Sequence, residues 1–423
     1  MREMKDSGVE WIGEIPADWE LSKIGAVYEE RNEKVSDVDF QPLSITKQGV
    51  VPQLETAAKT NDGENRKLIR KNDFVINSRS DRRGSCGISE YDGSCSLINT
   101  VLKPRRNMCN AYYSFVFRSE RFADEFYRWG NGIVDDLWST KWSNMKRIYI
   151  PAPSLQEQHR IADYLDRKCS QIDAIIARQQ EVIEKLKAYK LSVITEVVTK
   201  GLNPDVPMKD SGVEWIGEIP EHWKMVRLKF LLSHIIDCPH ETPIYSADGD
   251  YLVIRTADQD LGKLRTDEDM SRLDEGEYQN RIRRMPLEKD DIVYGREGER
   301  WGLACLVPES NKYCLGQRML QFRCKRELFL PRFAMWALNS KFVYLQGAVD
   351  TIGSTSPHVN ISTVRNFLIP VLPISEQQEI AEYIDKKMSQ LDKEIEHREN
   401  LICKLNEYKK SLIYEVVTGK QEV

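Results

Sequence analysis

The sequence lacks several features that would assign it to common classes of protein. No apolar run approaches the roughly 20 residues that a membrane-spanning helix needs. The opening Met-Arg-Glu-Met-Lys-Asp has none of the apolar core of a secretory signal. The nine cysteines include no Cys-x-x-Cys pair, which is the usual spacing for structural zinc. We therefore expect reduced thiols in a cytoplasmic protein.

The sequence also lacks the short motifs of common catalytic sites. It has no Gly-rich phosphate loop, no His-Glu-x-x-His and no Gly-x-Ser-x-Gly. The amino-methyltransferase signature is absent too, because Asn203–Asp205 departs from it at the third position. The run Cys238–Glu241 has no second pair of ligands to complete a tetrahedral metal set. We therefore predict no catalytic residue, no metal site and no cofactor in this chain.

What the sequence does contain is an internal duplication. The run Met-Lys-Asp-Ser-Gly-Val-Glu-Trp-Ile-Gly-Glu-Ile-Pro at 4–16 recurs unchanged at 208–220, an offset of 208 − 4 = 204 residues. Each copy is followed by a tryptophan, Trp19 or Trp223. A repeat of this length is a whole domain and not a solenoid unit, so we expect a two-lobed protein.

A second pair of repeats closes each half. Residues 150–199 and 369–418 share Ile-Pro, Glu-Gln and a final Glu-Val-Val-Thr at an offset of 369 − 150 = 219. Between the opening and closing repeats, the two halves diverge in sequence. Constant ends around divergent middles indicate one frame that carries two different recognition surfaces.

Each closing repeat predicts a long helix. From Asp166 to Thr199 there is no Pro or Gly, and apolar residues recur at three-and-four spacing. Each helix of about 34 residues would be roughly 50 Å long, and a short helix capped by Ser154 or Ser375 would precede it.

We predict that the two long helices pair along their apolar stripes. Separate amphipathic helices, each packed on its own domain, are the alternative. The stripes also include Tyr189 and Tyr408. The predicted seam consists of Ile172, Ile176, Ile183, Leu186, Val193, Leu391, Ile395, Ile402, Leu405 and Leu412.

The divergent regions are typical of mixed, strand-rich domains. Short apolar strands are expected at Asp73–Asn77 and Asp291–Gly295, each leading into a loop rich in Gly and Arg. Further strands are expected at Val101–Leu102, Tyr251–Ile254 and Leu303–Val307, and helices at Tyr112–Tyr127 and Pro331–Leu345.

The net charge of −5 argues against a nucleic-acid partner, but its distribution weakens that objection. Residues 17–153 contain 21 Lys/Arg and 19 Asp/Glu, a net charge of 21 − 19 = +2. Residues 221–373 contain 21 of each, 21 − 21 = 0, so −5 − 2 = −7 lies in the repeated segments. DNA binding needs only a local basic face.

Two loops at matching places, 77–87 and 295–302, combine arginine with glycine or serine. Arginine donates two hydrogen bonds to guanine in the major groove, and small polar groups hold phosphates. Glu297 would accept from a cytosine amino group, or pair with Arg296 or Arg300. A third polar element, at 138–142 in the first half and 353–358 in the second, precedes each closing repeat. The candidate set for DNA contact is Arg79, Arg82, Arg83, Lys141, Arg296, Arg300, Arg318, Ser354, Thr355 and His358.

Taken together, these features resemble the specificity subunits of type I restriction–modification enzymes over the whole chain, 1–423. The resemblance rests on the opening repeat with its tryptophan, the Pro-x3-Glu-Gln box of the first half with its Glu376-Gln377 counterpart, the Ile-Ala-x-Tyr-x-Asp boxes, and their duplicated order. It implies an α+β fold: two mixed α/β target recognition domains joined by two long antiparallel helices, a coiled coil, with pseudo-two-fold symmetry. The expected divisions are a first target recognition domain (1–153), a first helical region (154–200), a linker (201–207), a second target recognition domain (208–373) and a second helical region (374–423).

The resemblance also implies a function without catalysis in this chain. Each recognition domain would read one half of a bipartite, asymmetric double-stranded DNA site, and the helices would set the spacer and dock two methyltransferase subunits. Those partners would bind S-adenosylmethionine and methylate adenine, and restriction subunits would use ATP and Mg for translocation and cleavage. No base-contacting residue carries over from the family, so the candidate set rests on side-chain chemistry alone.

Two other functions remain open from the sequence. A cytosolic coiled-coil scaffold that binds protein partners is favoured slightly by the net charge, whereas the arginine loops favour DNA. A chain that itself methylates or cuts DNA is the weakest hypothesis, because the motifs are missing.

Overall fold

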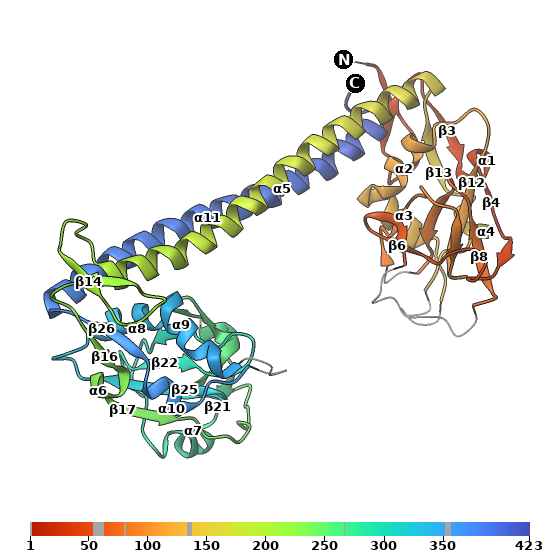
Figure 1. Cartoon of the computed structure of the whole chain (residues 1–423). Helices are drawn as coiled ribbons and strands as arrows, with labels where there is room; N and C mark the ends of the chain where they lie inside the picture. The colour runs from red at the N-terminus through yellow and green to blue at the C-terminus, as the bar shows by residue number, and fades with distance from the viewer. Residues whose placement is uncertain (1, 54–62, 80–81, 133–137, 266, 352–356) are drawn as a thin grey trace. The chain divides into compact units, whose positions relative to one another are not determined.

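The computed structural model describes residues 2–53, 63–79, 82–132, 138–265, 267–351 and 357–423 (Figure 1). The chain divides into two compact units, 1–180 with 399–423 (unit 1) and 181–398 (unit 2). Each unit therefore contains one divergent region and one end of each long helix. No helix in these described ranges is both long and apolar enough to cross a membrane.

Unit 1 is built on two small sheets. One has the strand order β10-β9-β12-β4, with every pairing antiparallel, and the other has the order β11-β8-β5. Its elements before the long helix are β1 Met4–Asp6, β2 Glu14–Pro16, β3 Glu20–Lys23, α1 Ile24–Val27, β4 Tyr28–Glu30, β5 Lys34–Val35, β6 Leu43–Thr46, β7 Gly49–Pro52, β8 Arg66–Ile69, β9 Phe74–Asn77, β10 Cys86–Ile88, β11 Gly93–Cys95, β12 Asn99–Pro104, α2 Asn110–Arg118, α3 Glu120–Arg128, α4 Trp142–Met145 and β13 Tyr149–Ala152.

Unit 2 repeats this plan with different residues. Its sheets have the orders β17-β25-β22-β23 and β21-β18-β24. Its elements are β14 Met208–Asp210, β15 Glu218–Pro220, β16 Lys224–Arg227, α6 Leu228–Leu231, β17 Leu232–Asp237, β18 Tyr251–Ile254, η3 Thr256–Asp258, β19 Gln259–Asp260, β20 Lys263–Leu264, η4 Asp267–Asp269, β21 Arg272–Leu273, α7 Glu275–Ile282, β22 Ile292–Gly295, β23 Ala304–Leu306, β24 Tyr313–Leu315, β25 Met319–Cys324, α8 Pro331–Leu338, α9 Lys341–Ala348, η5 Val349–Thr351, α10 Ile361–Arg365 and β26 Leu368–Val371.

The two four-stranded sheets correspond strand by strand, which confirms the duplication in three dimensions. β9 and β22 occupy the same place, and each pairs with a hairpin neighbour (β10 or β23) and with the next long strand (β12 or β25). Two helices and then a short one follow in both units. The strands predicted at β9, β12, β18, β22 and β23 are confirmed within one or two residues at most ends.

Two helices predicted as single elements are each broken in two. The helix expected at 112–127 ends at Arg118, because Ser119 is extended and its hydroxyl accepts a hydrogen bond from Phe122 N. The helix expected at 331–345 also breaks before Lys341, at an extended Ser340. The Ser119 side chain caps the helix that follows it, whereas the Ser340 hydroxyl donates back to Ala337 O of the preceding helix.

The long helices are longer than the sequence pattern predicted. α5 is continuous from Leu155 to Lys200 and α11 from Ile374 to Val417, with 46 and 44 residues. The separate short helices predicted before them do not exist, because no Pro or Gly interrupts either segment.

The predicted caps of these helices have different outcomes. Ser154 is the N-cap of α5, since its hydroxyl accepts from Glu157 N at 3.3 Å. Ser375 lies inside α11 and is not the cap. The first helical hydrogen bond instead runs from Gln377 N to Pro373 O at 3.0 Å.

The two helices pair antiparallel in both units. In unit 1, Lys409 Nζ lies 2.6 Å from Asp173 Oδ2, and in unit 2 Lys190 Nζ lies 2.5 Å from Asp392 Oδ1. The paired numbers have the same sum, 173 + 409 = 190 + 392 = 582, as antiparallel helices in constant register require. In Figure 1, α5 (yellow to green) and α11 (blue) lie side by side.

All ten predicted seam residues are at least partly buried. Ile176, Leu186 and Leu405 are partly buried against the cores, Ile395 and Ile402 are half-buried, and Ile172, Ile183, Val193, Leu391 and Leu412 are buried. Tyr189 and Tyr408, by contrast, are exposed. A helix with 3.6 residues per turn drifts against a heptad pattern, which moves these positions to the flank.

The helix ends are part of the domain cores. In unit 1, Leu165 of α5 and Val416 of α11 are buried with Tyr112 of α2 in one cluster. In unit 2, Ile384 of α11 and Val197 of α5 belong to the core of that unit. The helices therefore both pair with each other and pack on the domains, which combines the two arrangements considered from the sequence.

Candidate nucleic-acid interface

The repeated Trp and Glu residues hold each helix start to its own domain. Trp19 Nε1 donates to Glu157 Oε2 at 3.0 Å, and Trp223 Nε1 donates to Glu376 Oε1 at 3.1 Å. The C-terminal end of α11 also packs against the Trp19 ring. A Cβ on Gly419, at φ +73°, would lie 3.0 Å from Trp19. These repeated Trp and Glu residues therefore build a structural frame.

The repeated glutamines strengthen this frame. Gln158 accepts from Cys109 N and donates to Pro153 O, both at 2.9 Å. Gln377 accepts from Leu330 N at 2.9 Å and donates to two backbone carbonyls. Both side chains are buried, so these bonds are shielded from water.

In both units, the frame places the arginine loop beside the polar segment that precedes the closing strand. In unit 1, Arg79 forms a β-bridge with Ser139. In unit 2, Glu297 forms a β-bridge with His358, and Val359 N donates to Arg296 O at 2.9 Å. The structure thus brings together two predicted elements that lie about 60 residues apart in the chain.

Unit 1 carries a basic groove at this junction. Its cations are Arg79, Lys67, Lys141 and Lys146, and all except Lys67 are exposed. Lys67 is buried, and its Nζ lies 3.3 Å from Glu30 Oε1. The remaining lining is the acidic Glu30 and the polar or apolar residues Asn32, Ser78, Leu97, Ile98, Thr100, Ser139, Trp142 and Ser143. Such a lining offers charge for phosphates and donors for base edges.

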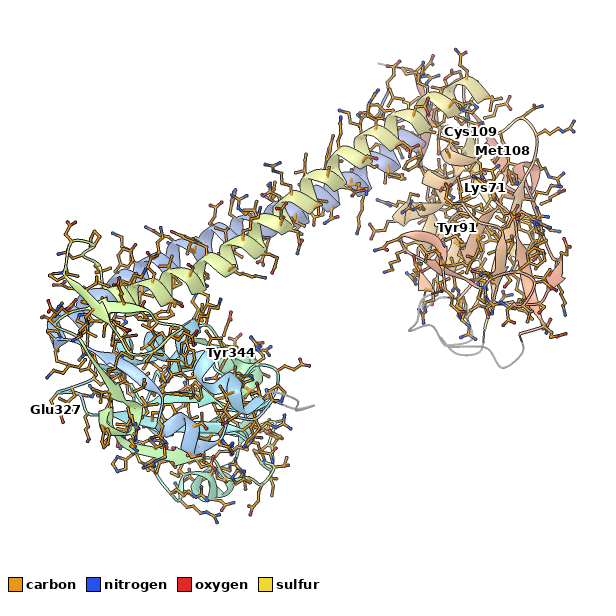
Figure 2. All side chains as sticks on the ribbon, viewed as in Figure 1. Lys71, Tyr91, Met108, Cys109, Glu327 and Tyr344 are labelled. Carbon is orange, nitrogen blue, oxygen red and sulfur yellow. The ribbon has the colours of Figure 1, made fainter. Side chains whose placement is uncertain are left out.

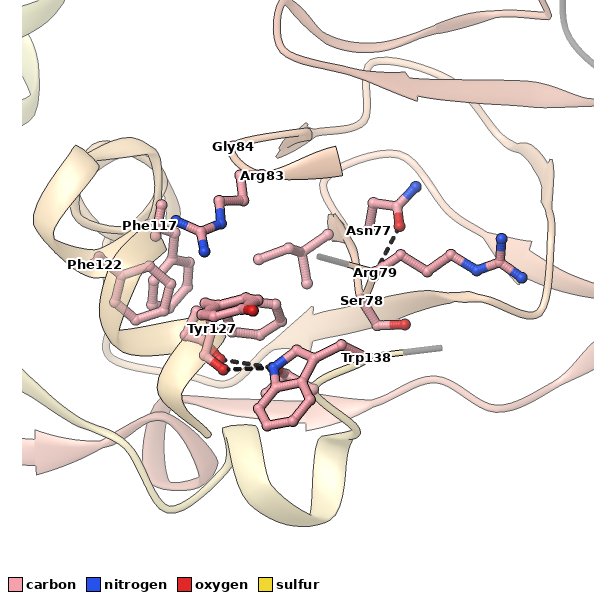
Figure 3. Close-up of a pocket in the computed structure, with 13 residues that line it drawn as sticks. Asn77, Ser78, Arg79, Arg83, Gly84, Phe117, Phe122, Tyr127 and Trp138 are labelled. Carbon is pink, nitrogen blue, oxygen red and sulfur yellow. Dashed lines mark hydrogen bonds between the residues drawn. The ribbon is translucent and has the colours of Figure 1, made fainter. Parts of the chain in front are cut away.

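The other arginines of the first loop are placed differently. Arg83 lies over the ring of Tyr127, with its guanidinium carbon 3.9 Å from the ring centre, and Nη1 lies 3.2 Å from Asp124 Oδ1. Figure 3 shows Arg83 directed toward Tyr127 while Arg79 points away from it. Arg82 is exposed on the turn between them. Of the predicted residues in unit 1, the structure therefore groups Arg79 with Lys141.

Arg296 in unit 2 is a buried residue of an ionic network, being only 4% exposed. Its guanidinium lies 3.3 Å from Asp237 Oδ1 and 3.1 Å from Glu297 Oε1. Nη1 donates to His358 Nε2 at 3.1 Å, and His358 Nδ1 lies 3.1 Å from Glu297 Oε1. The predicted DNA contact of Arg296 does not fit this placement, because a base could reach the guanidinium only if the network opened.

Three predicted residues of unit 2 are accessible. Arg318 is 55% exposed at φ +69°, and its Nε lies 3.9 Å from Glu297 Oε2. Arg300 is exposed, and its Nη1 donates weakly to Ala257 O at 3.4 Å. His358 is 46% exposed. Ser354 and Thr355 were also predicted to contact DNA, but they lie outside the described residues.

The second loop is anchored by an aromatic stack. The ring of Trp301 lies 4.2 Å from that of Tyr344, at an interplanar angle of 16°. Tyr344, labelled in Figure 2, projects from α9. Gly302 adopts φ +91°, and a Cβ there would lie 3.0 Å from the Tyr344 ring. This packing fixes the loop that carries Arg300.

Sequence reasoning missed Lys67 and Lys146 of the basic groove. Lys67 lies in strand β8, and two adjacent cations, Arg66 and Lys67, before an apolar pair were the available signal. Lys146 follows the short helix α4, which the sequence pattern did not predict. Their role depends on strand pairing, which a linear pattern does not show.

Five cysteines buried in the domain cores are not activated as nucleophiles. Burial raises the pKa of the Cys86, Cys95, Cys305, Cys314 and Cys324 thiols to about 12, so they stay protonated. Across the described ranges, no three His, Cys, Asp or Glu side chains are placed to hold a metal ion together. What the geometry supplies is positive charge and hydrogen-bond donors.

Known proteins resemble the chain along nearly its full length. The type I restriction enzyme MjaVIII specificity subunit of Methanocaldococcus jannaschii is 25% identical, over 97% of this chain and 94% of its own length. The putative MjaX specificity subunit of the same organism is 22% identical, over 97% and 96%. The StySPI specificity subunit of Salmonella potsdam is 23% identical, over 83% and 75%.

Two solved structures share the fold. One comes from a study of complex assembly and conformational transition of the type I R-M system. It has a TM-score of 0.70 and 15% identity, and the match covers 96% of this chain and 99% of that one. The HsdS subunit from Thermoanaerobacter tengcongensis has a TM-score of 0.52 and 15% identity, with 96% and 98% covered.

The family model for the type I restriction modification DNA specificity domain matches this chain twice, at residues 16–185 and 220–406. The two matches coincide with the two halves of the duplication, and each runs from a divergent region into a long helix. The chain therefore belongs to the type I restriction modification DNA specificity family.

Proposed function

We propose that this chain is the DNA-recognition subunit of a type I restriction–modification complex and that each unit reads one half of a bipartite, asymmetric site. Family membership supports recognition of DNA as the activity. The two units share a frame but differ in the residues they expose at equivalent loops, which supports two different half-sites.

The main support for this proposal is an arrangement found in both units. The arginine loop pairs with the polar segment that precedes the closing strand, through Arg79 and Ser139 in unit 1 and through Glu297 and His358 in unit 2. Unit 1 exposes Arg79, Lys141 and Lys146 there, and unit 2 exposes Arg300 and Arg318. An acidic chain that places exposed cations at the same point of two frames has a local basic face in each.

Partners supply the chemistry in this proposal. Two methyltransferase subunits would dock on the paired helices and carry S-adenosylmethionine, and restriction subunits would use ATP and Mg. The continuous, paired helices suit a ruler for the DNA spacer. We place the complex in the cytoplasm, a reducing compartment in which the nine free cysteines would stay reduced.

The scaffold alternative is less well supported. It requires the lobes to bind proteins only, although family membership and the exposed cations both favour DNA.

A mobility shift on mixed duplex DNA, with methyltransferase subunit present and at two salt concentrations, tests the proposal. Arg79→Ala with Lys141→Ala should weaken binding and lower the dependence on salt, since fewer counterions are released. Lys71→Ala, an exposed cation of the same unit outside the groove (Figure 2), is the control. Binding that is equally strong in all three proteins would place the DNA face elsewhere.

A further inference from the structure

One segment of identical sequence has two different environments in this molecule. The hairpins β1–β2 and β14–β15 have the same register and the same turn, in which Gly8 N or Gly212 N donates to an aspartate at 2.9 Å. Yet Trp11 is 5% exposed, whereas its counterpart Trp215 is 48% exposed. Sequence and local fold are the same, so the surroundings of the hairpin cause the difference.

In unit 1, the chain itself covers the hairpin. The ring of Trp11 lies edge-on to Phe122 of α3, 5.5 Å between centres. The carbonyl of Ile12 accepts from Tyr414 Oη at 3.0 Å and from Lys420 Nζ at 2.5 Å. An aromatic ring and a cation therefore occupy the face of this hairpin.

In unit 2, the matching face is open. A Cβ on Gly13 would lie 3.3 Å from Lys420 Nζ, whereas a Cβ on Gly217 would have no atom within 4 Å. Among the described residues, no side chain donates a hydrogen bond to the Ile216 carbonyl. A groove beside the hairpin is lined by Ile216 and by exposed apolar residues of its surroundings: Tyr189, Leu202 and Tyr383.

The charge around this groove selects its occupant. Glu196 and Glu218 line it, Glu214 is exposed on the hairpin tip, and Lys200 is the one basic lining residue. The lining itself holds two carboxylates against one ammonium, and Glu214 adds a third carboxylate nearby, a balance that disfavours DNA phosphates and favours a basic protein segment. The same hairpin in unit 1 already receives a lysine ammonium, from Lys420.

We propose that the face of Trp215, Ile216 and the adjoining groove docks a basic segment of a partner protein, with an aromatic or aliphatic side chain that covers Trp215. The segment would supply to unit 2 what Phe122 and Lys420 supply to unit 1. This inference rests on the proposed function, because the partner is taken to be a protein subunit of the DNA-binding complex.

The test measures binding of the purified methyltransferase subunit to the full-length chain by titration calorimetry. Trp215→Ala should weaken binding about tenfold or more, as truncation of an interface tryptophan commonly does. Glu214→Lys combined with Glu218→Lys should weaken it as well, through charge repulsion. Tyr91→Ala is the matched control, because Tyr91 is 45% exposed but lies in unit 1 (Figure 2).

Folding and DNA binding are measured on the same proteins. Trp215→Ala should unfold at the wild-type temperature because the ring is exposed, whereas Trp11→Ala should lower the unfolding temperature. Wild-type affinity of Trp215→Ala for the methyltransferase would overturn the inference. So would a loss of DNA binding by Trp215→Ala in the absence of the methyltransferase. Neither result would remove the DNA-recognition proposal, which the groove variants of unit 1 test separately.

Discussion

At the scale of single residues, the molecule separates residues that hold the frame from residues that face solvent. The repeated tryptophans, glutamates and glutamines bond to each other and to backbone groups. The divergent loops instead expose cations such as Arg79 and Arg318. The repeated Trp, Glu and Gln residues therefore have a structural role, and the divergent loops supply the cations proposed for recognition.

Gln377 shows how much one frame residue contributes. Gln377→Ala would leave Leu330 N and two carbonyls without their buried partner, and each unsatisfied group costs about 1–3 kcal/mol. We expect the free energy of unfolding in urea to fall by at least about 2 kcal/mol. Gln378→Ala, at the exposed neighbouring position, should change it by less than about 0.5 kcal/mol. Equal effects of the two substitutions would contradict the role given to Gln377.

The burial of individual arginines could not be predicted from the sequence. Arg296 and Arg300 lie in one loop with similar neighbours, yet Arg296 is buried and Arg300 is exposed. The partners that bury Arg296, Asp237 and His358, lie about 60 residues away on either side. No local pattern contains that information.

At the scale of elements, the five strands that local patterns predicted are present, most other strands were missed, and helix boundaries were predicted poorly. Short apolar strands such as β9 and β22 appear as expected because burial on both faces requires continuous apolar runs. The breaks at Ser119 and Ser340 were not foreseen, because serine is tolerated inside helices as well as at their caps. The continuity of α5 into its first turns depends on anchoring by Glu157 and Gln158, whose partners lie in the domain.

A charge introduced in the seam should destabilise the paired helices, whereas a charge on their exposed faces should not. Ile183 is 2% exposed, so Ile183→Asp would bury an unpaired carboxylate at a cost of about 3–5 kcal/mol. Ile175→Asp, on the same helix at a residue 45% exposed, is the matched control and should be tolerated. Circular dichroism during urea unfolding measures both. A tolerated Ile183→Asp would show that the helix pair contributes little to stability.

At the scale of the whole molecule, the protein is a duplicated frame in which paired helices connect two DNA-recognition domains. If the helices set the spacer, lengthening both should lengthen it. Seven residues inserted after Lys187 and after Ile395 add about 10.5 Å of helix, equivalent to about three base pairs at 3.4 Å each. We expect the methylated motif to gain a spacer of that size. An unchanged spacer in a complex that still assembles would exclude the ruler.

The central claim is that each unit reads its own half-site independently. The most direct measurement is the affinity of the complex for single-base variants of both half-sites, using Arg79→Ala with Lys141→Ala in one protein and Arg300→Ala with Arg318→Ala in another. Each lost base contact should cost about 1–3 kcal/mol. The first protein should lose discrimination at one half-site only, and the second at the other only. Equal loss at both half-sites from either protein would contradict independent reading.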